Sequence, residues 1–210
     1  LSVMFQNASS FDQDIGAWNT TNVLTMSGMF WGASLFNQDI GAWNTTNVKE
    51  LSGMFSGAKS FNQDISRWNI SNVEYLNSMF SGASSFDQNI GNWNTTNVID
   101  MHEMFFNSKS FNQDISEWNT SKVTNMKSMF FGASSFNQDI GTWHLSPNVN
   151  LMYMLDSSGL DCFHYSATLN GWQSKIPTVT KRILGANGLH YGTNAESARN
   201  TLVNSQGWTI

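Results

Sequence analysis

The sequence predicts an α/β solenoid: a right-handed stack of coils with short helices, a parallel sheet and a C-terminal cap. The main observation is a repeat of 25 residues in which Phe, Ile and Trp keep fixed places. The tryptophans that mark it are Trp18, Trp43, Trp68, Trp93, Trp118 and Trp143. Repeats of this length are typical of stacked folds, because no single unit can bury its apolar face alone.

Each unit contains an apolar pattern that predicts a short helix. One face of a helix carries the residues at i, i+3, i+6 and i+7, which here are Val48, Leu51, Met54 and Phe55. Thr46 or Asn47 can cap its start, and Gly57 lies where it would end. A helix of about ten residues is unstable alone in water, so we expect neighbouring coils to stabilise it.

A second segment of the unit predicts a strand. It follows the pattern Phe-[Asn/Asp]-Gln-[Asp/Asn]-Ile-[Gly/Ser]-x-Trp, as in residues 61–68. Around Gln63 to Ser66 the side chain of Ile65 is expected to point inward, with its neighbours facing out. Equivalent strands of successive coils would then form a parallel sheet with a spacing of about 4.8 Å.

The repeat ends before the chain does. We expect residues 1–158 to form about six repeats and residues 159–210 a capping segment continuous with them. In this tail, residues 161–172 resemble a helix, 181–184 a strand, 187–188 a turn, 193–204 a helix and 207–210 a last strand. An atypical terminal unit is what a stacked array requires to cover its apolar end.

Composition restricts the possible partners. The net charge of −5 argues against nucleic acid or an anionic membrane as a partner. The single Cys162 excludes an intramolecular disulfide, and no apolar window is long enough for membrane insertion. Leu1 begins in mid-repeat, which predicts that the chain is a fragment, so missing targeting signals carry little weight.

An aspartate column is the first candidate site. It consists of Asp14, Asp39, Asp64, Asp114 and Asp139, with Asn89 at the fourth of the six positions. It is either a track for divalent cations such as calcium or a structural row that bonds backbone N–H groups of a neighbouring coil. Asn89 favours the structural interpretation, because an amide keeps the acceptor but loses the charge. We therefore predict no metal site.

Other patterns have weaker functional interpretations. Paired Thr or Ser residues, such as Thr45 and Thr46, could form an ice-binding array, but Ile70 interrupts one row and Thr-Asn is also a natural helix cap. The Asn-x-[Ser/Thr] motifs recur at one repeat position, so turn chemistry explains them better than glycosylation. The four histidines make no metal-ligand or catalytic spacing. We expect no enzymatic activity and no cofactor.

The position before each Trp is the candidate binding row. It varies freely in an otherwise strict repeat, which indicates side chains that do not pack on the next coil. We expect Arg67, Asn92 and Glu117 to be exposed in one line, with Asp64 and Asp114 beside them. An exposed row on a rigid scaffold is suited to recognition. A row that is merely solvated remains the alternative.

The unit Met-Phe-x-Gly-Ala-x-Ser-Phe-Asn-Gln-Asp-Ile-Ser-x-Trp-Asn-Thr-Ser-Asn-Val resembles the repeats of BspA-like leucine-rich-repeat surface proteins of bacteria. The resemblance implies a leucine-rich-repeat-like solenoid on a secreted or surface-anchored protein. It also implies adhesion, with a protein or glycan partner and no catalytic residues. The alternatives are a structural spacer or stalk of a larger surface protein and, behind both, an ice-binding or calcium-binding solenoid.

Overall fold

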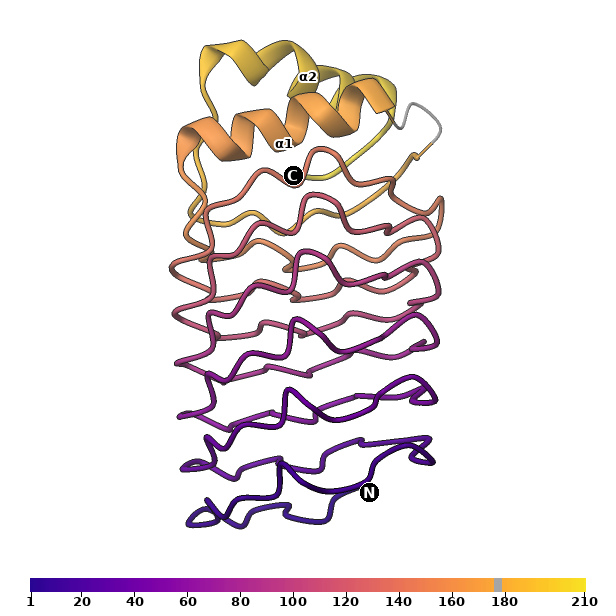
Figure 1. Ribbon diagram of the computed structural model, residues 1–210. Coiled ribbons are helices and arrows are strands. Elements are labelled where there is room, and N and C mark those ends of the chain that lie inside the picture. Colours follow the sequence, from indigo (N-terminus) through magenta and orange to yellow (C-terminus); the bar gives the residue numbers. More distant parts are fainter. Residues whose placement is uncertain (176–178) are drawn as a thin grey trace.

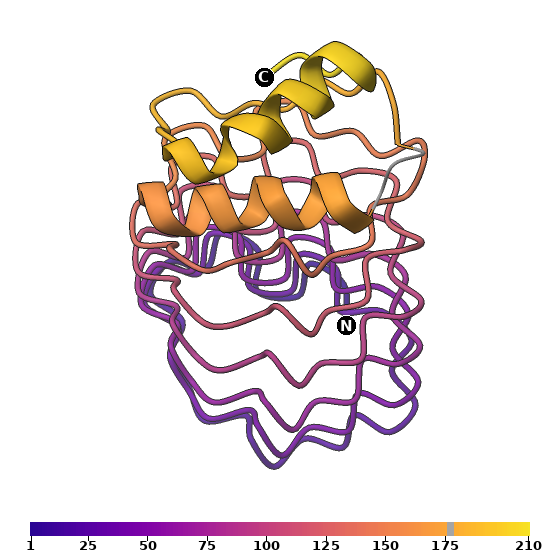
Figure 2. The same cartoon turned by 90° about the horizontal axis from the view of Figure 1, so that it is seen from above.

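The computed structural model describes residues 1–175 and 179–210. The chain runs through successive coils stacked along one axis, and the helical segments gather at the C-terminal end of the stack (Figure 1). These segments are α1 (Cys162–Lys175), the 3₁₀ helix η1 (Thr193–Ala195), α2 (Glu196–Asn200) and the π-helical η2 (Thr201–Ser205). Seen along the stack, the coils lie behind one another and α1 crosses the last of them (Figure 2).

The predicted α/β architecture is wrong. The described residues contain no β-strand, and the coils contain no helix. Instead of a sheet, isolated parallel bridges join successive coils, one residue in each. They pair Thr25 with Glu50, Glu50 with Tyr75, Tyr75 with Asp100, Asp100 with Asn125, and Asn125 with Asn150. This column lies in the segment expected to be helical, not in the segment expected to be a strand.

Left-handed residues explain why the apolar segment is not helical. Gly53 and Gly57 have φ values of +60° and +70°, a conformation that a right-handed helix cannot contain. The N–H groups of Met54, Ser56 and Ala58 each donate to the carbonyl three residues earlier, at 3.0–3.1 Å. The segment is therefore a run of tight turns. It nevertheless buries Leu51, Met54, Phe55 and Ala58, which keep the spacing of three and four residues expected of a helix.

The intervening N–H groups of this segment bond to the next coil. Gly53, Phe55 and Gly57 donate to the carbonyls of Asn77, Met79 and Ser81 at 2.7–2.9 Å. Backbone groups that a helix would satisfy internally are thus satisfied between coils. We call the outward side of this segment, residues 25–32 and their equivalents in the other coils, the ladder face.

The segment expected to be a strand is held by side chains. The Asn62 N–H donates to Oδ1 of Asn37 at 2.9 Å, and Asn62 Oδ1 accepts the N–H of Asp87 at 3.0 Å. Gln63 Nε2 donates to the Asn37 carbonyl at 2.8 Å. These amides replace the backbone ladder of a sheet, which is why no strand forms. Ile65 is nevertheless fully buried, as expected.

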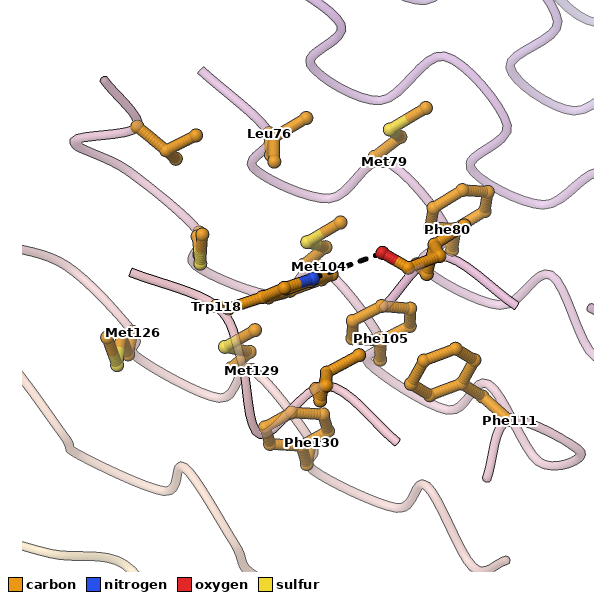
Figure 3. Close-up of a cluster of buried hydrophobic side chains, with 14 of the residues drawn as sticks. Leu76, Met79, Phe80, Met104, Phe105, Phe111, Trp118, Met126, Met129 and Phe130 are labelled. Carbon is orange, nitrogen blue, oxygen red and sulfur yellow. Dashed lines mark hydrogen bonds between the residues drawn. The ribbon is translucent and has the colours of Figure 1, made fainter. Parts of the chain in front are cut away.

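Aromatic columns fill the core (Figure 3). Phe80, Phe105 and Phe130 stack with ring centroids 5.6–5.7 Å apart in neighbouring coils. Trp118 is buried, and its Nε1 donates to the Ile90 carbonyl at 3.1 Å, the bond drawn in Figure 3. The same bond recurs from Trp43 through Trp143.

The tail continues these columns with different elements. Trp172 of α1 donates to the Ile140 carbonyl at 3.0 Å, so the helix provides the next tryptophan of the column. Helix α1 occupies the place expected for a helix at 161–172, whereas the helix expected at 193–204 is divided into η1, α2 and η2. The strands expected at 181–184 and 207–210 are only bridges, Leu151 to Leu184 and Ile183 to Thr209. None of the described helices is long and apolar enough to cross a membrane.

Candidate functional site

A groove of about 660 Å³ opens on the ladder face of the N-terminal coils. Its floor is made of small, mostly half-buried residues, namely Ser52, Gly53, Ser56, Asn77, Ser78 and Ser81. Its rim carries Val3, Trp31, Glu50, Tyr75 and Glu103. We call this hollow the ladder groove. It combines large exposed side chains with a polar floor that a ligand can reach.

The groove exists because one column of the repeat changes size. The equivalent positions hold Trp31, Ser56, Ser81, Phe106 and Phe131 in successive coils. The serines leave space between the exposed Trp31 on one side and the Phe106–Phe131 pair on the other, whose rings stack 5.1 Å apart. Backbone bonds hold these coils together, so the outward side chains can vary without loss of stacking.

Two carboxylates and no cation line the groove. Glu50 and Glu103 are half-buried, and each has one weak hydroxyl contact at 3.5 Å, from Thr25 and Ser78 respectively. Across residues 1–175 and 179–210, the ion pairs are His102–Asp100 and His164–Asp161, and neither involves these glutamates. The groove is therefore an acidic hollow with two exposed aromatic rings, Trp31 at 49% and Tyr75 at 39% exposure.

The predicted binding row lies elsewhere. Arg67, Asn92 and Glu117 are exposed at equivalent positions of three successive coils, but none lines the ladder groove. Glu117 borders a separate shallow hollow together with Thr142 and Lys175. The structure leaves the binding role of this row as a prediction.

Asp64 and Asp114, expected beside that row, are exposed but have structural partners. Their Oδ1 atoms accept the N–H groups of Ser66 and Ser116 at 2.9 Å. Hydrogen bonds from Ser66 lower the pKa of Asp64, and the positive charge of Arg67 adds to the effect. Both carboxylates are therefore already engaged in local turns.

The whole aspartate column makes this bond. Each Oδ1, including that of Asn89, accepts the N–H two residues later at 2.8–3.0 Å. The partner lies in the same coil, not in the neighbouring coil as expected, because the side chain closes a turn. Within the part of the chain that the structure describes, no three His, Cys, Asp or Glu side chains cluster in a way that could hold a metal.

The threonine pairs divide between the interior and the surface. Thr45 is buried and donates to the Asn69 carbonyl at 3.0 Å, and Thr20, Thr95 and Thr120 make the same bond to the next coil. Thr46 is exposed. One member of each pair is therefore unavailable to a surface array.

Sequence reasoning missed the amide column that connects the coils. It is named for its four Asn members, and its two Asp members accept through a carboxylate instead. Each side chain accepts a backbone N–H from the next coil, and the members are Asp12, Asn37, Asn62, Asp87, Asn112 and Asn137. The signal was present, because only Asn or Asp occurs there and Gln always follows it in these units. Sequence reasoning also misses the ladder groove, because the spacing of the apolar residues in these segments predicts helices.

Comparison with known proteins corrects the expected family. A family model described as Mycoplasma protein of unknown function, DUF285, matches residues 1–97 and again residues 87–186. The BspA-like leucine-rich-repeat resemblance is not supported, since the matching model is a different one. No curated protein and no solved structure matches the chain. Because the two matches together span most of the sequence, the chain belongs to the DUF285 family.

Proposed function

We propose that the chain is a non-enzymatic recognition module that binds a segment of a partner protein in the ladder groove. The observation that carries the proposal is the composition of the groove, which consists mainly of Trp, Tyr, Ser, Gly and Asn. Antibody binding sites use the same residues, because the aromatic rings provide rigid contact area and the small polar residues adaptable hydrogen bonds.

The size and the rigidity of the groove support the proposal. Its volume of about 660 Å³ is that of a typical ligand site. Its floor is set by inter-coil backbone bonds, such as Gly53 N–H to Asn77 O at 2.8 Å. A pre-formed surface on a rigid scaffold loses little entropy on binding, which favours recognition.

The chemistry of the lining supports binding over catalysis. The described residues that line the groove include serines but no His, Lys or Cys that could activate them. The Ser52 hydroxyl donates to Asn77 Oδ1 at 2.7 Å and is thus already engaged. The module is therefore proposed to hold its partner without transforming it. The cell-surface setting remains a prediction.

The test is to fill the groove. Ser56→Phe together with Ser81→Phe puts large rings where the same column already holds Phe106 and Phe131, so the fold should accept them. Ser85→Leu is the matched control, because Leu35 occupies the equivalent place outside the groove. A random twelve-residue peptide library and a glycan array are each screened against the parent protein, the filled variant and the control.

We expect peptides that bind the parent protein and the control but lose at least tenfold in affinity for the filled variant. If glycans and not peptides bind in a groove-dependent manner, the partner is a carbohydrate and not a protein. Equal binding to all three proteins would reject the groove as the site. No selected ligand of either class would favour a structural spacer.

A further inference from the structure

We infer that the ligand of the ladder groove presents a lysine or arginine side chain, bound beside Glu50 and its bridge partner in the next coil, the exposed Tyr75, with Glu103 adding negative charge to the same groove. The inference rests on the proposed function, because it names the chemistry of the group that enters the same groove. The occupant is a cationic side chain of a protein segment.

The negative charge of the groove is not compensated by its lining. Glu50 and Glu103 are half-buried in the lining, and none of the other lining residues is a cation. Their hydroxyl contacts at 3.5 Å are weak and each involves a single carboxylate oxygen. Half-buried carboxylates without a counter-charge are stabilised when a cation binds, whereas an anionic ligand would be repelled. The net charge of −5 also steers cationic partners toward the protein.

The aromatic rim of the groove also favours a cation. Trp31 and Tyr75 are exposed at the edge of a groove that contains carboxylates, a combination that binds the guanidinium group of arginine or the ammonium group of lysine. The exposed Val3 offers apolar contact for the methylene groups of such a side chain. The chain contains an internal example of this pairing, since the Arg199 guanidinium lies 5.5 Å from the Tyr191 ring centroid in the tail.

The probes are single residues with blocked ends: Nα-acetyl-lysine amide, Nα-acetyl-arginine amide and Nα,Nε-diacetyl-lysine amide. The readout is the indole N–H signal of Trp31 in a ¹⁵N-correlation spectrum, which a Trp31→Phe variant assigns. The indole N–H groups of the core tryptophans are bonded to backbone carbonyls and serve as internal references.

We expect the two cations to shift the Trp31 signal with saturation in the millimolar range, and the diacetylated lysine to shift it much less. Glu50→Gln with Glu103→Gln should weaken the response about five- to thirtyfold, as expected for the loss of two partly exposed charges. The matched control is Asp64→Asn with Asp114→Asn, which removes two carboxylates outside the groove. Asn89 shows that an amide is tolerated at this position.

The outcomes separate this inference from the proposed function. The inference of a cationic ligand would be overturned if charged and acetylated lysine shift the Trp31 signal equally. It would also be overturned if the double Gln variant responds as the parent protein does. If neutral peptides from the library still bind in a groove-dependent manner, the proposed function stands without it. If neither the probes nor the library depend on the groove, both proposals fall together.

Discussion

The two sides of each coil are joined to the next coil by different groups. On the ladder face, backbone N–H groups donate to backbone carbonyls, as from Phe55 to Met79 at 2.9 Å. On the opposite segment, amide side chains make the connection, as from Asp87 N–H to Asn62 Oδ1 at 3.0 Å.

This difference decides where the repeat can vary. The amide column admits only Asn or Asp, because the side chain itself carries the bond. The equivalent bridge positions on the ladder face hold Thr25, Glu50, Tyr75, Asp100 and Asn125. Variation without loss of stacking is what a recognition surface requires, so the groove lies on the side where the backbone holds the coils.

The largest expected loss of stability comes from substitutions in the core, which lies between the ladder face and the segment with the amide column. Trp68→Ala should lower the free energy of unfolding by about 3–5 kcal/mol, because it leaves a cavity between coils and removes the bond to Ile40 O. Trp18→Ala is the matched control and should cost much less, since Trp18 is 38% exposed. Denaturant unfolding of both variants provides the measurement. If Trp68→Ala lowers the free energy of unfolding by less than about 1 kcal/mol, the tryptophan column is not tightly packed.

The next effect tests the two sides directly. Asn62→Ala removes the acceptor for Asp87 N–H and for Gln88 Nε2, so it should cost about 1–3 kcal/mol through unsatisfied polar groups. Ser81→Ala on the ladder face should stay within about 0.5 kcal/mol, because its backbone makes the inter-coil bond. Equal losses in urea unfolding would mean that the two sides do not differ as described.

Acid should loosen the end of the amide column. Asp161 is bonded to the last member, Asn137: its N–H donates to Asn137 Oδ1, and its carboxylate accepts from Asn137 Nδ2 and the His164 N–H at 2.8–2.9 Å. These bonds, first that from Asn137, lower the pKa of Asp161 to about 2. Because the pKa of Asp161 is lower in the folded state than its unfolded value of about 3.9, the ionised carboxylate stabilises the folded protein at a pH above that value. This contribution is lost as the pH falls toward 2.

The melting temperature between pH 5 and pH 2 measures this contribution. The parent protein should lose more stability over this range than Asp161→Asn, which keeps an acceptor that does not titrate. Parallel pH profiles of the two proteins would show that Asp161 contributes nothing to acid sensitivity.

The smallest effect concerns the aspartate column. Asp64→Asn with Asp114→Asn should leave the melting temperature almost unchanged, since Asn89 makes the same turn bond at 3.0 Å. Millimolar calcium should also change it little, because a ligand of the folded state alone would raise it by mass action. If calcium raises the melting temperature of the parent protein but not of the double variant, the aspartate column is a site for divalent cations after all.

The sequence alone determined the 25-residue period and most of the core. Apolar side chains that recur at one position align in successive coils: the Phe and Trp rings stack, and the Ile side chains are buried. It also located α1, because no repeat pattern competes with the helical signal there.

Tertiary structure decided the conformation of the coil. Spacing of three and four fits both a helix and a run of turns, and only the left-handed backbone at Gly53 and Gly57 distinguishes them. The groove, too, depends on structure, because Trp31, Ser56 and Ser81 belong to different coils and become neighbours only through stacking. The period of the repeat predicts which residues align in successive coils. The bonds between the coils decide which of these residues are exposed and can form a binding site.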